Sequence, residues 1–147
     1  KTPILSDSSP LNGLTENILS ATRQVHVFRD PTRGGVATAL NEIAGQSGVG
    51  IRLFEEDLPI SPAVAAAAEV LGMDPLYLAN EGKLVAVIPA GCTEAVLQTM
   101  RAHPAGEHSA RIGQVGESPA GTVILKTGFG GERIVDMLVG EQLPRIC

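Results

Sequence analysis

Helical and strand-like spacings of apolar residues alternate along the chain, and this alternation limits the folds open to it more than any other feature. Before Pro104, segments with helical spacing follow segments that are typical of strands, with loops between them. The segments are a helix over 15–22, a strand over 25–28, a helix after Gly35, a strand over 49–53, a helix from Pro62, a strand over 84–88 and a helix over 93–103. Such an order favours helices packed against a sheet.

Strand-like segments dominate the chain after Pro104, and Gly and Pro between them predict hairpins. These segments are 111–117, 122–126 and 133–139. Residues 84–88 are apolar at every position, which predicts a strand buried on both faces in the middle of a sheet. The alanines of 65–68 predict a helix that approaches the sheet closely. We therefore predict an α/β (α+β) two-layer fold, with one mixed β-sheet covered on one face by helices.

Composition narrows the class of partner. The 147 residues suffice for one domain with its own core, and the formal net charge is −5 without a Lys/Arg cluster. With 3% aromatic residues the chain is a poor match for nucleic acid, and no apolar run is long enough for a membrane span. Cys92 and Cys147 form neither a disulfide framework nor a metal-ligand cluster, which indicates a reducing cytoplasm and no metal site. Because the chain begins with Lys1, we expect it to be part of a longer protein.

A cysteine, Cys147, is the last residue of the sequence. Pro144 favours an extended backbone before it, and Gly140 allows the tail to leave the body freely. A thiol at the tip of such a tail can reach a distant site. The α-carboxylate on the same residue disfavours the reactive thiolate, and the positive charge of Arg145 partly offsets that effect. Two interpretations stay open on this pattern alone: a working thiol, or a frayed end with an incidental cysteine.

The segment from Asp30 to Gly35 is the most informative internal motif. A strand leads into Asp30, Thr32 and Arg33, and a helix follows the pair Gly34–Gly35. Backbone N–H groups at a helix start can meet an anion closely where no Cβ intervenes, and Arg33 adds a donor for phosphate or carboxylate. The alternative is a helix capped by Asp30 or Thr32 after a tight glycine turn, with no ligand.

Glu81 lies between Asn80 and Gly82, directly before the apolar strand. A carboxylate at a strand edge is a candidate general base, and a turn glutamate without a catalytic role is the alternative. The glycine-rich segment 127–131 lacks the Gly-Lys-Ser/Thr ending of a P-loop and predicts a hairpin turn.

Three segments together resemble the HypE family of hydrogenase expression/formation proteins: RDPTRGGVATALNEIA at 29–44, NEGK at 80–83 and PRIC at 144–147. The resemblance covers the whole chain but only the second half of that family's length. It implies the fold of the C-terminal domain of aminoimidazole ribonucleotide synthetase and selenophosphate synthetase. It also implies a synthetase-like domain over 1–139 and a flexible tail over 140–147, with the N-terminal ATP-binding domain absent.

The resemblance implies an ATP-dependent dehydratase that makes the cyanide ligands of [NiFe] hydrogenase. A partner, HypF, would place a carbamoyl group on Cys147, and the product cyanide would pass to a HypC–HypD complex. Glu81 is then the candidate base, and Asp30, Thr32, Arg33, Gly34 and Gly35 would lie on the phosphate side of the cleft. ATP and Mg²⁺ would be held mostly by the absent domain, which would also form a homodimer. This fragment alone is expected to be inactive.

Two other functions stay open. The first is a carrier or docking module whose carbamoylated thiol is processed elsewhere. The second is a domain of a selenophosphate or purine synthetase, in which Cys147 would be dispensable.

Overall fold

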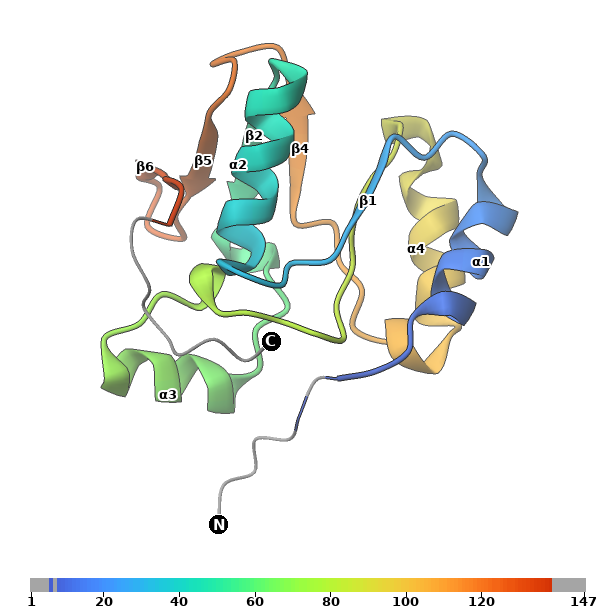
Figure 1. Ribbon diagram of the computed structural model, residues 1–147, viewed down its shortest axis with the longest axis horizontal. Helices are drawn as coiled ribbons and strands as arrows, with labels where there is room; N and C mark the ends of the chain where they lie inside the picture. Colours follow the sequence, from blue (N-terminus) through green and yellow to red (C-terminus); the bar gives the residue numbers. More distant parts are fainter. Residues whose placement is uncertain (1–5, 7, 139–147) are drawn as a thin grey trace.

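The computed structural model describes residue 6 and residues 8–138. Within these residues the chain forms four α-helices and six β-strands (Figure 1). The elements are α1 (Asn12–Ala21), β1 (Val27–Arg29), α2 (Gly35–Ser47), β2 (Gly50–Phe54), α3 (Pro62–Leu71), β3 (Val85–Val87), α4 (Thr93–Arg101), β4 (Gly113–Gly116), β5 (Val123–Lys126) and β6 (Glu132–Ile134). Short 3₁₀ turns lie between them, and the one that matters for the site is η2 (Pro75–Tyr77).

The larger sheet has the strand order β4-β2-β5-β6. Strand β2 is antiparallel to β4 and parallel to β5, and β5 is antiparallel to β6. Figure 1 shows α2 lying across one face of this sheet. The buried core there joins α2 to the strands and to two neighbouring segments, through Ala37, Leu40, Ala44, Ile51, Leu53, Leu76, Val123, Leu125 and Val135.

The smaller sheet is a two-stranded antiparallel ribbon of β1 and β3. Helices α1 and α4 lie side by side against it (Figure 1). Leu14 and Ile18 of α1 are buried there against Val96 of α4, and Phe28 of β1 packs against them. The molecule therefore has two cores, and β1 leads from the smaller one directly into α2.

The predicted two-layer α/β class is confirmed, because helices cover one face of each sheet. On the opposite face of the larger sheet, Arg52 and Ile124 are partly exposed and Ile134 is 60% exposed. The prediction of a single mixed sheet was wrong, because the strands form two separate sheets. The strand predicted over 84–88 belongs to the ribbon, and its residues are only half-buried.

The predicted hairpins are right in one case and wrong in the other. Strands β5 and β6 form a hairpin, but β2 lies between β4 and β5. The predicted contact of α3 with the sheet was also wrong. Helix α3 begins as predicted, with Ser61 accepting from Val64 N at 3.4 Å, but only Ala68 of the helix is buried.

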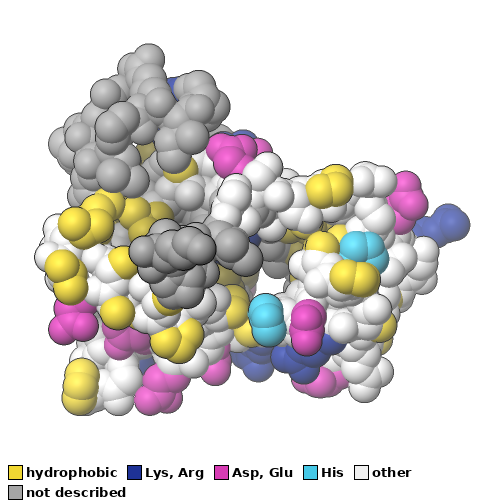
Figure 2. All heavy atoms as spheres, turned by 90° about the horizontal axis from the view of Figure 1, so that it is seen from below, with side chains coloured by type: hydrophobic (Ala, Val, Ile, Leu, Met, Phe, Trp, Pro, Cys, Tyr) yellow, Lys and Arg dark blue, Asp and Glu magenta, His cyan; other side chains and the backbone are white. Residues whose placement is uncertain are grey.

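Apolar side chains of α3 stay exposed, including Val70 at 86% and Leu71 at 69%. Figure 2 shows hydrophobic side chains exposed, with acidic ones among them, over the half of the molecule that carries α3. No helix within 8–138 combines the length and the hydrophobicity that a membrane crossing needs.

Candidate functional site

The turn from β1 into α2 is built on two glycines. Gly34 and Gly35 have φ of 74° and 63°, in the left-handed region that favours glycine. The Gly35 N–H donates to Thr32 O at 3.0 Å, and the Thr38 N–H donates to Gly34 O at 3.1 Å. A Cβ on Gly34 would lie 2.1 Å from Thr38 Oγ1, so this position has no room for a side chain.

Neither Asp30 nor Thr32 caps α2, so the alternative of a side-chain cap was wrong. The N-cap is Gly34, and no side chain bonds the first amides of the helix. The reason is geometric: the left-handed glycine pair turns the backbone before either side chain can fold over the helix end. Asp30 and Arg33 are exposed beside this turn. Gly34 and Gly35 are buried and the Gly35 N–H is already engaged, so the exposed donor that this turn offers to an anion is the Arg33 guanidinium.

Gly35 is pressed against η2. A Cβ on Gly35 would lie 2.4 Å from Leu76 O and 2.6 Å from Leu78 O. The η2 turn is itself held by Asp74, whose Oδ1 accepts from Leu76 N at 2.9 Å. The first residue of α2 thus packs directly on the backbone of residues 76–78.

The same segment brings Glu81 to the turn. The Asn80 N–H donates to Pro31 O at 3.0 Å, and Asn80 Nδ2 donates to Leu78 O at 2.7 Å. Pro31 is fully buried, which anchors the contact. Glu81 follows Asn80 directly and is exposed. The structure thus places the two predicted segments, 30–35 and 80–82, side by side.

The segment after β6 is held against the same region. Val135 is fully buried, and its carbonyl accepts from Asn41 Nδ2 of α2 at 2.7 Å. Tyr77 Oη of η2 donates to Asp136 O at 3.0 Å. Next to these bonds, Arg133 pairs with Asp74 at 2.5 Å. The chain that leads to Cys147 therefore leaves from η2 and α2, although Cys147 itself lies outside the described residues.

Sequence reasoning missed Asn41, Asp74 and Tyr77. A signal existed for Tyr77, which is the single tyrosine of the chain. Burial raises the pKa of Tyr77, and the nearby Asp74 carboxylate raises it further. The phenol therefore stays protonated at neutral pH and keeps its donor role.

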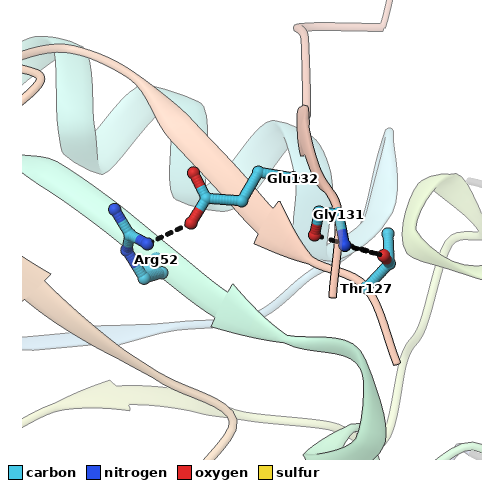
Figure 3. Close-up of polar contacts among 4 residues, drawn as sticks. All are labelled: Arg52, Thr127, Gly131 and Glu132. Carbon is cyan, nitrogen blue, oxygen red and sulfur yellow. Dashed lines mark hydrogen bonds and ion pairs between the residues drawn. The ribbon is translucent and has the colours of Figure 1, made fainter. Parts of the chain in front are cut away.

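The remaining candidates have structural roles. Thr127 Oγ1 accepts from Gly131 N at 3.1 Å and closes the β5–β6 turn, as Figure 3 shows beside the ion pair of Arg52 and Glu132. Gly128 N is already bonded to Glu55 Oε2 at 2.9 Å. This confirms the predicted hairpin turn over 127–131. Cys92 is a free thiol packed against the smaller core.

The described part of the chain contains no group of three His, Cys, Asp or Glu residues that could hold a metal ion. The exposed Arg33 guanidinium suits an anionic group such as phosphate. It does not suit Mg²⁺, which prefers carboxylates and water.

The family model for the C-terminal domain of AIR synthase related proteins matches residues 5–126. The chain belongs to this family, a class of α/β synthetase-type domains. Within it the chain is 55% identical to carbamoyl dehydratase HypE of Cupriavidus necator, over 99% of this chain and 42% of that protein. The resemblance to HypE proteins is thereby confirmed, and the chain spans less than half the length of this relative.

Two solved structures extend the comparison. A crystal structure of hydrogenase maturation protein HypE in complex with ATP superposes with a TM-score of 0.92 at 47% identity, covering 99% of this chain and 44% of the other. A crystal structure of a HypE–HypF complex superposes with a TM-score of 0.88 at 46% identity, covering 94% and 45%.

Proposed function

We propose that this chain is the C-terminal domain of an ATP-dependent carbamoyl dehydratase that converts S-carbamoyl-Cys147 to a thiocyanate and donates cyanide to hydrogenase iron. One observation supports this most: the glycine turn, Glu81 and the segment leading to Cys147 meet at residues 74–80. The name of the Cupriavidus relative and the ATP complex of a related HypE point to the same chemistry.

The proposed reaction balances without any change of oxidation state. The carbamoyl oxygen attacks the γ-phosphorus of ATP, the bond from that phosphorus to the β,γ-bridging oxygen breaks, and ADP leaves. The phosphorylated carbamoyl group then loses its two N–H protons in turn, one to Glu81 and the other to water. The freed electron pairs complete the carbon–nitrogen triple bond while the carbon–oxygen bond breaks and phosphate departs. The products are protein thiocyanate, ADP and phosphate.

Each residue has one role in this scheme. Cys147 holds the carbamoyl carbon covalently, so the intermediate cannot diffuse away. Glu81 is the base that accepts an N–H proton, which its exposed carboxylate at the turn is free to do. Arg33, exposed beside the Gly34–Gly35 turn, binds phosphate oxygens, with Asp30 and Thr32 at the rim of that site.

We assign most contacts to ATP and Mg²⁺ to the part of the full-length protein that this chain does not span. The synthetase-like domain then occupies 1–139, and 140–147 is the tail that carries the thiol. We further propose HypF as the carbamoyl donor, a HypC–HypD complex as the acceptor, and a cytoplasmic homodimer. The related HypE–HypF complex supports the first of these partners.

Mass spectrometry of the full-length protein tests the proposal. After incubation with HypF, carbamoyl phosphate and ATP, we expect Cys147 to gain one carbamoyl group and then lose one water. Glu81→Gln should retain the carbamoyl group and lose water at least about 100-fold more slowly, as expected for removal of a general base. Glu94→Gln is the control, since Glu94 is exposed at the start of α4, away from the site.

The outcomes separate the alternatives. If the protein without substitutions gains the carbamoyl group but does not lose water, the chain is a carrier module. Full hydrogenase maturation by Cys147→Ala would point to a different synthetase reaction and refute the role of the terminal thiol. Unchanged water loss in Glu81→Gln would remove Glu81 from the mechanism.

A further inference from the structure

The η2 turn holds the segment that precedes the tail. Tyr77 Oη donates to Asp136 O at 3.0 Å, and Arg133 pairs with Asp74 at 2.5 Å. From the other side, Asn41 Nδ2 donates to Val135 O at 2.7 Å. We call Asn41, Asp74 and Tyr77 the tail clamp. All three side chains hold residues 133–136, which lie within β6 or directly after it.

The tail clamp lies next to the candidate site. The carbonyls of Leu76 and Leu78, on either side of Tyr77, press on Gly35 at the start of α2. Asn80, two residues after Leu78, bonds the turn through Pro31 O. The point where the tail leaves the domain is thus set by the same short segment that sets the positions of Glu81 and of the phosphate turn.

The clamp also sets how many residues separate its last bond from Cys147. Counted from Asp136, the last residue that the clamp holds, eleven residues (137–147) span at most about 40 Å. Released after Ile134, thirteen residues (135–147) would span about 45 Å. A longer tether from a less defined origin lowers the effective concentration of the thiol at its site.

We propose that Tyr77 and Asn41 are positioning residues for the dehydration step, which fix the origin of the tail so that the group on Cys147 meets Glu81 and the phosphate turn. The inference rests on the proposed function. Neither residue is assigned contact with the reacting atoms, since the Tyr77 hydroxyl and the Asn41 amide are both engaged with backbone carbonyls.

The test uses the full-length protein, carbamoylated by HypF before ATP is added. Tyr77→Phe removes the hydroxyl and keeps the ring. We expect the single-turnover rate of water loss to fall about fivefold, the factor that corresponds to one hydrogen bond of ordinary net strength. In the double variant, Tyr77→Phe with Asn41→Leu, the rate of water loss should fall further. Arg101→Met is the matched control. Arg101 lies on α4, and its side chain donates to the backbone carbonyl of Ser109, so the substitution removes a bond of the same kind away from the site.

Two further readouts distinguish positioning from general damage. The KM for ATP and the rate of carbamoylation should stay within about twofold of the unmodified protein, while amide exchange rises in 136–138 and stays unchanged in 30–38. The inference would be overturned if the variants lost water at a rate within twofold of that of the protein without substitutions. It would also be overturned if the KM for ATP rose in parallel with the loss of rate. If the unmodified protein itself loses no water, the proposed function fails and this inference with it.

Discussion

Replacing three glycines of one helix by alanine separates backbone strain from steric contact at the candidate site. Gly45 lies inside α2 without a positive φ, and a Cβ there meets nothing within 4 Å. Gly48 ends the helix with φ of 65° and also has open space around it. Gly35 combines φ of 63° with backbone oxygens that would lie 2.4 and 2.6 Å from a Cβ. Each substitution therefore adds one physical effect to the previous one.

The magnitudes follow in order. Gly45→Ala should stabilise the chain by about 0.5–1 kcal/mol, because alanine restricts the unfolded backbone and favours helix. Gly48→Ala should destabilise it by about 1–2 kcal/mol, the cost of a left-handed conformation for a residue with a Cβ. Gly35→Ala should cost that amount plus about 1–3 kcal/mol of overpacking, since the obstructing atoms are backbone carbonyls that cannot rotate away.

Urea unfolding followed by far-ultraviolet circular dichroism measures all three free energies. Against a total stability of about 5–15 kcal/mol, a loss of about 2–5 kcal/mol in Gly35→Ala is large and easily resolved. The reasoning would be refuted if Gly35→Ala cost no more than Gly48→Ala, because the close packing of α2 on η2 would then not exist in solution. A destabilising Gly45→Ala would refute the assignment of that residue to the helix interior.

Two further predictions concern the isolated chain. It should release no phosphate from ATP above background in a malachite-green assay, because we assign most nucleotide contacts to the part it does not span; robust ATP-dependent release would contradict that division. Tyr77 should titrate above its usual pKa of 10.0, since burial and Asp74 both disfavour the phenolate. Because the folded pKa is raised, the contribution of Tyr77 to stability should be fully present below about pH 10 and be lost as the pH rises through the folded pKa of Tyr77. With one tyrosine and no tryptophan, the ultraviolet difference spectrum reports this titration directly, and a midpoint at or below 10.0 would count against the contacts described for η2.

Local patterns predicted most of the elements. Ser61 and Pro62 mark the start of α3, and the helix after Gly34–Gly35 begins where expected. These signals succeed because capping, glycine conformation and helical spacing depend on residues within one or two turns of each other. The same approach failed for residues 84–88, where continuous apolarity is compatible with a central strand and equally with the observed ribbon packed against α1 and α4.

The candidate site shows the same division. The sequence alone identified the Gly34–Gly35 turn, Glu81 and Cys147 as separate candidates, and similarity of three short segments identified the family. Tyr77 and Asn41 were not identified, because their role lies in hydrogen bonds to carbonyls of residues 135 and 136, far along the chain.

By itself, then, the amino-acid sequence determined the alternation of helices and strands, the glycine turn before α2 and the presence of a cysteine at position 147. Only the tertiary structure decided that the strands form two sheets and that η2 joins the turn, Glu81 and the base of the tail. The physical reason is that local conformation depends on neighbouring residues, whereas strand pairing and the meeting of distant segments depend on which surfaces bury each other. No local pattern along the chain encodes that choice.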